Sequence, residues 1–103
     1  MTELEAQRER IAGKLTGQHF MHHIGFSIHR IDLGEVEGEM PIAPFSLHQM
    51  GYVHGGITAT LADIVAGFAA YTRTPLDRNV VTSSLHVQFF SPGYGDSLRA
   101  VGR

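Results

Sequence analysis

Two groups that could act together in acyl transfer lie within residues 51–71. Gly55 and Gly56 stand where a long apolar helix is expected to begin, so their backbone N–H groups have no acceptor within the helix. Such N–H groups, at the positive end of the helix dipole, polarise a carbonyl and stabilise the oxyanion formed in acyl transfer. The same helix carries one carboxylate, Asp63, which could act as a general base on water or as a nucleophile.

These groups are too far apart to act on one carbonyl within a single chain. Asp63 follows the glycines by seven to eight residues, which at the helical rise is about 11 Å. Two antiparallel copies of the helix would bring the Asp63 of each near the glycines of the other. We therefore predict a two-fold dimer with composite sites, in which the Thr82 hydroxyl orients the water. Such an approach is favoured by the small residues around Asp63, which are Ala59, Thr60, Ala66 and Gly67.

The N-terminal quarter of the chain predicts two helical segments. Thr2 followed by Glu5 matches a capping box and predicts a helix over residues 2–16. A short helical turn ended by Gly25 follows it. Three histidines lie in this turn, but no acidic or thiol ligand accompanies them, so we expect no metal site.

The remaining elements are expected to form an antiparallel sheet beside the helix. From Phe26 onward, apolar residues recur at every second position, as in a half-buried β-strand. This pattern predicts a hairpin whose second strand covers residues 35–42, with its glutamates facing solvent. Alternating β-branched residues predict another strand over Asn79–Phe90, and a further strand begins at Ser97. The long helix presents one core stripe, made of Ile57, Leu61, Ile64, Val65 and Phe68. The fold class is therefore α+β.

Composition excludes several classes of function. The chain has 103 residues, a formal net charge of −2 and no cysteine, which argues for one domain, against a nucleic-acid partner and against thiol chemistry. The N-terminus is too charged for a secretory signal, and the apolar stretch Ile57–Tyr71 is too short to cross a membrane. We expect a cytoplasmic protein with no membrane partner.

The central stretch Val53–Asp63 resembles the signature of hotdog-fold thioesterases of the phenylacetate-pathway (PaaI) type. In that family an HGG turn begins the central helix and an aspartate follows it. The segment Thr82–Pro92 is similar to the family's next strand, and Ile24-Gly25-Phe26 fits the start of its first strand. The resemblance implies a hotdog fold, in which an antiparallel sheet wraps around the helix. Residues 1–17 would form an N-terminal helix and residues 18–103 a hotdog domain that is C-terminally short, lacking the last strands of the family's sheet.

The resemblance also implies an activity, the hydrolysis of acyl-CoA thioesters. By position, the Gly55 amide would polarise the thioester carbonyl, Asp63 of the other subunit would activate water, and Thr82 would lie near that water. His48 stands where many members carry an amide side chain that assists at the carbonyl. The substrate would also contact His54, Gly56 and Ser83. Coenzyme A would belong to the substrate, so no cofactor is expected, and the assembly would be a homodimer or a dimer of dimers.

Two other functions compete with hydrolysis. A hotdog domain with an incomplete sheet could bind acyl-CoA or another acyl ligand, or only form oligomers, without turnover. A dehydratase of the same fold is the third reading, but no hydratase-type histidine motif supports it. The length of the acyl chain is not encoded in any local motif.

Overall fold

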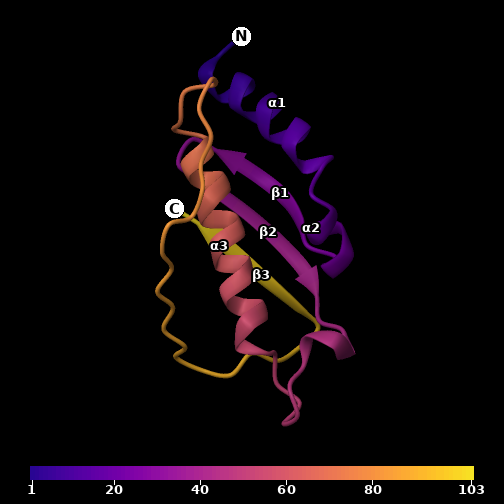
Figure 1. The fold of residues 1–103 in the computed structure, drawn as a ribbon. Coiled ribbons are helices and arrows are strands. Elements are labelled where there is room, and N and C mark those ends of the chain that lie inside the picture. The colour runs from indigo at the N-terminus through magenta and orange to yellow at the C-terminus, as the bar shows by residue number, and fades with distance from the viewer.

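The computed structural model describes all of residues 1–103 as three α-helices and a three-stranded antiparallel sheet (Figure 1). Each strand pairs with the next in sequence, in the order β1-β2-β3, and the long helix α3 lies across one face of this sheet. No helix combines the length and hydropathy that crossing a bilayer requires. The elements are α1 (Glu3–Leu15), α2 (His19–Ile24), β1 (Ser27–Asp32), β2 (Glu35–Pro41), a 3-10 turn (Pro44–Ser46), α3 (Gly55–Tyr71) and β3 (Ser97–Gly102).

The two N-terminal helices form as their sequence signals predict. Thr2 Oγ1 accepts the Glu5 backbone N–H at 3.1 Å, and the Glu5 carboxylate accepts the Thr2 N–H in return. This reciprocal pair satisfies two of the N–H groups that begin α1. Helix α2 ends at Gly25, whose φ of 79° places it in the left-handed region that glycine adopts without strain.

The predicted hairpin is confirmed as β1 and β2, joined through Leu33 and Gly34. Along β2 the residues Val36, Gly38 and Met40 are buried, while the intervening glutamates face away from the core. Gly38 is required here because an added Cβ would overlap the Phe26 ring. The period of two in the sequence therefore identified the buried face of the sheet correctly.

The core lies between α3 and the sheet. From α3 it contains Leu61, Val65, Phe68 and Ala69, of which the first three belong to the predicted stripe. The backbone of Gly102 in β3 lies against the backbone of Val65, leaving no room for a side chain. The other core members come from α1, α2 and the hairpin: Ile11, Met21, Ile24, Phe26, Val36 and Met40.

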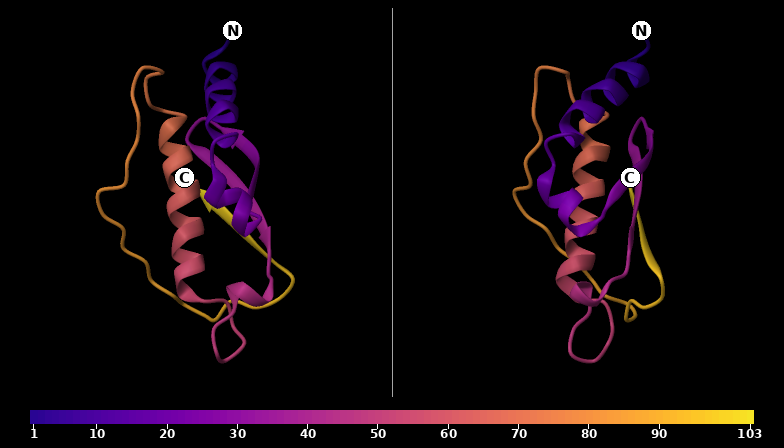
Figure 2. Two further views of the ribbon diagram at one scale, coloured as in Figure 1. Left: turned by 45° about the vertical axis from the view of Figure 1, so that its right-hand side comes forward. Right: turned by 90° about the vertical axis from the view of Figure 1, so that its right-hand side faces the viewer.

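One predicted strand is wrong. Residues Asn79–Phe90 form no strand, and their backbone makes no hydrogen bond with another strand. They run alongside α3, which stands between them and the sheet (Figure 2). Because a β-strand exists only beside a hydrogen-bonded neighbour, β propensity alone could not produce one here. Val81 and Phe90 are consequently 87% and 93% exposed.

Candidate functional site

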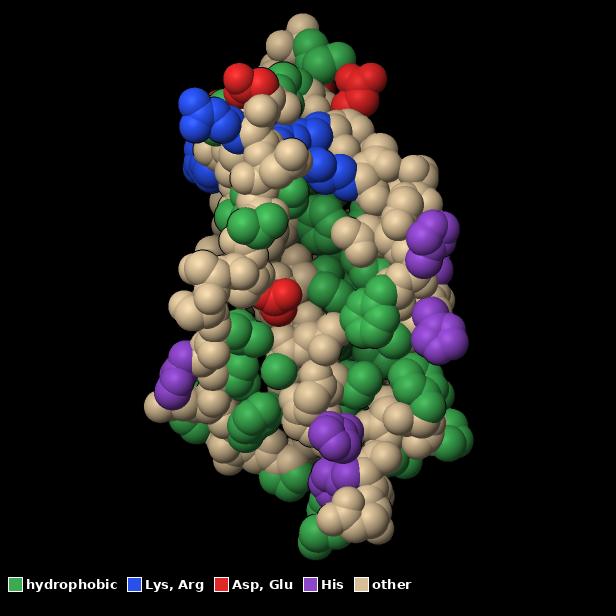
Figure 3. Space-filling model, in the orientation of Figure 1, with side chains coloured by type: hydrophobic (Ala, Val, Ile, Leu, Met, Phe, Trp, Pro, Cys, Tyr) green, Lys and Arg blue, Asp and Glu red, His purple; other side chains and the backbone are tan.

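The carboxylate of α3 lies in a groove of about 680 Å³ between α3, α2 and the segment that follows α3. Figure 3 shows this face, where hydrophobic side chains gather along the hollow. Asp63 itself is half-buried. The groove is lined by Lys14, Gly17, Gln18, Phe20, Met21, Ala59, Thr60, Asp63, Ile64, Gly67, Phe68, Tyr71, Val80, Thr82 and Leu85.

The structure brings the Thr82 side chain to Asp63, although Thr82 is not on a strand. The sequence predicted that the Thr82 hydroxyl orients the water, and that role stays a prediction. The Thr82 hydroxyl donates a hydrogen bond of 2.6 Å to Asp63 Oδ1. Asp63 Oδ2 has no hydrogen-bond partner in the chain. The contact thus holds the carboxylate in one orientation and leaves its second oxygen able to accept a proton from water.

At the start of α3, His54 caps the helix through its side chain. His54 Nδ1 accepts the Gly56 N–H at 2.9 Å, so the neutral ring carries its hydrogen on Nε2. The N–H of Ile57 bonds to the His54 carbonyl. Gly55 N–H, in contrast, has no acceptor in the chain and remains able to bind a carbonyl oxygen. Of the two glycine amides singled out in the sequence, only that of Gly55 is free.

Phe89 borders this free amide. A Cβ built on Gly55 would lie 3.4 Å from the Phe89 ring, so the aromatic ring forms one wall beside the N-terminus of α3. The sequence showed Phe89 only as part of an expected strand, and no local pattern pointed to this contact.

His48 and Ser83 form no hydrogen bond with Asp63, Thr82 or Gly55. His48 Nδ1 accepts the Met50 N–H at 3.0 Å inside a tight turn, and its ring meets Tyr52 edge-on. The neutral His48 ring therefore also presents Nε2–H as a donor. Ser83 is exposed, and its side chain makes no hydrogen bond. The roles assigned to these residues, and to His54 and Gly56, remain predictions.

Residues of α1 and α2 also line the groove, which the sequence analysis missed. Lys14, Phe20 and Met21 line it together with Asp63. The sequence offered one signal, because Lys14 follows Ile11 by three residues and so shares the inward side of α1. No cluster of three or more histidine, cysteine, aspartate or glutamate side chains is arranged to hold a metal ion.

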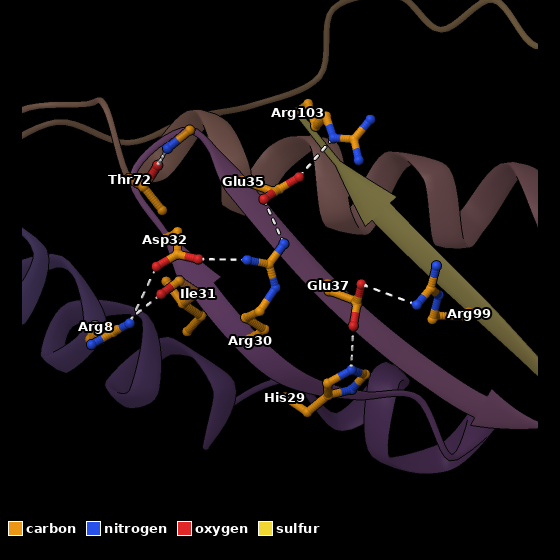
Figure 4. Close-up of polar contacts among 11 residues, drawn as sticks. Arg8, His29, Arg30, Ile31, Asp32, Glu35, Glu37, Thr72, Arg99 and Arg103 are labelled. Carbon is orange, nitrogen blue, oxygen red and sulfur yellow. Dashed lines mark hydrogen bonds and ion pairs between the residues drawn. The ribbon is translucent and has the colours of Figure 1, made fainter.

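The perturbed ionisable groups lie on the outer face of the sheet instead (Figure 4). Hydrogen bonds from Arg103 and Arg30 lower the pKa of Glu35, which in turn raises the pKa of Arg30. A hydrogen bond from His29 lowers the pKa of Glu37. Shifted pKa values often mark functional sites, but here they arise from surface ion pairs across neighbouring strands.

Helix α3 thus carries two half-sites. One is the oriented Asp63 carboxylate in the middle of the helix, and the other is the free Gly55 N–H at its start. Residues 50–103, more than half of the chain, match the model of the thioesterase superfamily. The chain belongs to this superfamily. Its antiparallel sheet and long helix α3 are those of a hotdog thioesterase of the PaaI-like type.

A curated relative and two solved structures are similar to this superfamily member. The proofreading thioesterase EntH of Klebsiella pneumoniae is 30% identical over 70 residues, which cover 68% of this chain and 51% of that protein. The chain thus spans about half the length of this relative. A thioesterase family protein from Silicibacter pomeroyi has 26% identity and a TM-score of 0.89, covering 92% of this chain and 70% of that one. The E. coli PaaI protein shares the fold at 22% identity, with a TM-score of 0.86 over 97% of this chain and 71% of its own.

Proposed function

We propose that this superfamily member hydrolyses acyl-CoA thioesters at a site shared by two copies of the chain. The observation that carries the proposal is the Asp63 carboxylate, set in a groove lined by both apolar and polar side chains, with Oδ1 held by Thr82 and Oδ2 free. A half-buried carboxylate held in one orientation suits a general base that acts on one bound water.

In this mechanism the thioester carbonyl oxygen binds the Gly55 N–H of one copy. Asp63 Oδ2 of the other copy removes a proton from water, and the resulting hydroxide attacks the carbonyl carbon. The Gly55 N–H and the dipole of α3 stabilise the tetrahedral oxyanion. The carbon–sulfur bond then breaks, and the proton held by Asp63 passes to the departing thiolate. His48 Nε2–H would act as a second donor to the carbonyl oxygen.

The same carboxylate could instead attack the carbonyl carbon directly. That route forms an acyl anhydride on Asp63 with loss of the thiolate, and water then hydrolyses the anhydride. A single turnover in ¹⁸O-water reveals the nucleophilic route when water attacks the Asp63 carbonyl of the anhydride, because label then enters the Asp63 carboxylate. When water attacks the acyl carbonyl, both routes label only the product acid, and trapping the anhydride with hydroxylamine distinguishes them.

The activity is tested by thiol release from a panel of acyl-CoAs. Asp63→Asn keeps the size of the side chain and removes the base, so kcat should fall by about 10²- to 10⁴-fold. Asp77→Asn is the matched control, because Asp77 is exposed and forms no ion pair. Equal rates for the native chain and Asp63→Asn would refute the role of Asp63.

A second function is favoured by the other side of α3. β3 is an edge strand of the sheet, and an open groove of about 410 Å³ lies between it and α3. Exposed strand edges favour association with another chain. This surface suits a non-catalytic module that binds an acyl ligand or forms oligomers. Binding of acyl-CoA by the native chain without thiol release would support this module over the enzyme.

A further inference from the structure

Residues 79–90 run antiparallel to α3 and contact it near both of its ends (Figure 2). Where the helix ends, the Tyr71 hydroxyl donates a hydrogen bond of 3.3 Å to the Val80 carbonyl. Where the helix begins, the Phe89 ring packs against Gly55. The segment therefore follows α3 over its whole length.

This segment reaches both half-sites on α3. Thr82 holds the Asp63 carboxylate, and Phe89 lies beside the free Gly55 N–H. When two copies of the chain share each site, these two contacts of one chain belong to different catalytic centres. The mechanism proposed above gives Thr82 a task at the carboxylate and gives Phe89 none at the N–H.

Gly55 offers the one free N–H in the first turn of α3. The Gly56 N–H is bonded to His54 Nδ1, and the N–H groups of Ile57 and Thr58 are bonded to the His54 carbonyl. An oxyanion at this helix start can therefore receive a backbone hydrogen bond from Gly55 alone. Its stabilisation depends on what surrounds that N–H, because a hydrogen bond to a developing charge is stronger where water is excluded.

The Phe89 ring supplies an apolar surface at this N–H. A Cβ built on Gly55 would lie 3.4 and 3.5 Å from two carbons of the ring, and that position is two bonds from the Gly55 nitrogen. Phe90 is the next residue, and it is 93% exposed, since neighbouring side chains of an extended segment point in opposite directions. Phe89, and not Phe90, is therefore placed to keep water from the Gly55 N–H.

We propose that Phe89 is a positioning residue of the oxyanion site, whose ring excludes water from one side of the Gly55 N–H. The proposal rests on the hydrolytic function proposed above and adds to it a residue that no sequence motif singled out. With the ring in place, the N–H donates to the thioester oxygen without competition from water on that side. The benefit grows as negative charge develops on the oxygen, so Phe89 stabilises the transition state more than the bound thioester.

Binding of a transition-state analogue tests the proposal without turnover. S-trifluoroacetonyl-CoA carries a ketone that hydrates to a tetrahedral species, whose oxygen resembles the oxyanion. Phe89→Ala should raise the Kd of this analogue by about tenfold, less than the 10²- to 10³-fold cost of losing an oxyanion donor. The Kd of coenzyme A, which has no such oxygen, should stay unchanged. An unchanged Kd for the analogue, or equal losses for both ligands, would overturn the proposal.

Kinetics separate the loss of the ring from damage to the fold. Phe89→Ala should lower kcat for acyl-CoA by about tenfold and leave KM unchanged, because the effect arises in the transition state. Phe89→Leu keeps an apolar side chain at the N–H and should recover most of kcat. Phe90→Ala is the matched control, because it removes an exposed ring from the same segment, and it should keep native kcat. A kcat for Phe89→Leu as low as that for Phe89→Ala would contradict the role of an apolar wall.

Mixing with an excess of Asp63→Asn chains shows at which half-site Phe89 acts. A Phe89→Ala chain paired with an Asp63→Asn chain forms one centre from its own Asp63 and the intact Gly55 and Phe89 of the other chain. Thiol release per Phe89→Ala chain should therefore rise by about tenfold on mixing. If Phe89 acted through Thr82 on the Asp63 of its own chain, mixing would restore nothing, and that result would overturn the proposal.

The two proposals can fail separately. A native chain that releases no thiol, but loses affinity for the analogue alone in Phe89→Ala, would remove the hydrolytic function and leave the role of Phe89 standing. A chain that hydrolyses acyl-CoA with native kcat after Phe89→Ala would do the reverse.

Discussion

At the scale of single residues, the site depends on a contact between two side chains nineteen positions apart. Thr82 is exposed, and its segment has no strand to hold it, yet its hydroxyl lies 2.6 Å from Asp63 Oδ1. The hydrogen bond links this segment to the helix and selects one orientation of the carboxylate. In the proposed mechanism it therefore positions the base without touching the substrate.

Replacing Thr82 with valine keeps the shape of the side chain and removes the donor. We expect kcat for acyl-CoA hydrolysis to fall by about tenfold, the equivalent of one lost hydrogen bond to a charged group. Thr82→Ser should retain most of the activity, because it keeps the hydroxyl. Steady-state kinetics with circular dichroism as a folding control measure the effect. Loss of activity in Thr82→Ser equal to that in the valine variant would contradict the role of the hydroxyl.

At the scale of elements, the hairpin β1–β2 separates a buried face from a charged one. Its inner residues pack beneath α3, and its outer glutamates form ion pairs with neighbouring strands. Because the pKa values of Glu35 and Glu37 are lowered in the folded chain, these groups link stability to pH. Each lies in a partly exposed ion pair on the outer face of the sheet, so its individual contribution is small and sensitive to salt.

Stability should fall as the pH drops below about 4.3, the usual pKa of a free glutamate. In this range the unfolded chain binds protons that the folded carboxylates still exclude, so the stabilisation present at neutral pH is lost as the pH falls through the lower, folded values. Urea unfolding at pH 7, 5, 4 and 3 measures this slope. Glu35→Gln should be less stable at pH 7 and show a shallower slope, whereas Glu9→Gln, at an exposed glutamate without an ion pair, should keep the native slope. Identical slopes for all three chains would exclude the Glu35 ion pairs as the cause.

At the scale of the whole molecule, the proposed chemistry requires two copies of the chain. The free Gly55 N–H begins α3, and Asp63 lies about 11 Å further along the same helix. Small residues around Asp63 would let a second α3 approach closely. Gly67 belongs to this small-residue face, and nothing lies within 4 Å of a Cβ built on it.

Gly67→Gln should preserve the fold and abolish the dimer. Its side chain enters open space in the single chain and improves helix propensity by up to about 1 kcal/mol, but it would block a second helix. Gly13→Gln is the control, because Gly13 also has open space around it and lies on α1. Sedimentation velocity should show a dimer for the native chain and for Gly13→Gln, and a monomer for Gly67→Gln. A native chain that is active as a monomer would refute the shared site.

Local patterns in the sequence determined most of the elements. The Thr2–Glu5 capping box, the period of two along β2 and the glycines that begin α3 act between residues close in the chain. Their consequences therefore follow from spacing alone. For the same reason the sequence could single out Asp63 and Gly55, and could place them on one helix at a known separation.

Only the tertiary structure decided what lies beside these groups. Residues 79–90 have the β-branched pattern of a strand but form none, because pairing requires a neighbour that pattern cannot supply. The contact of Thr82 with Asp63, and that of Lys14 with the Tyr71 ring, join segments far apart in the chain. Such contacts depend on how helices and loops pack, and packing is a property of the whole core that no local spacing encodes.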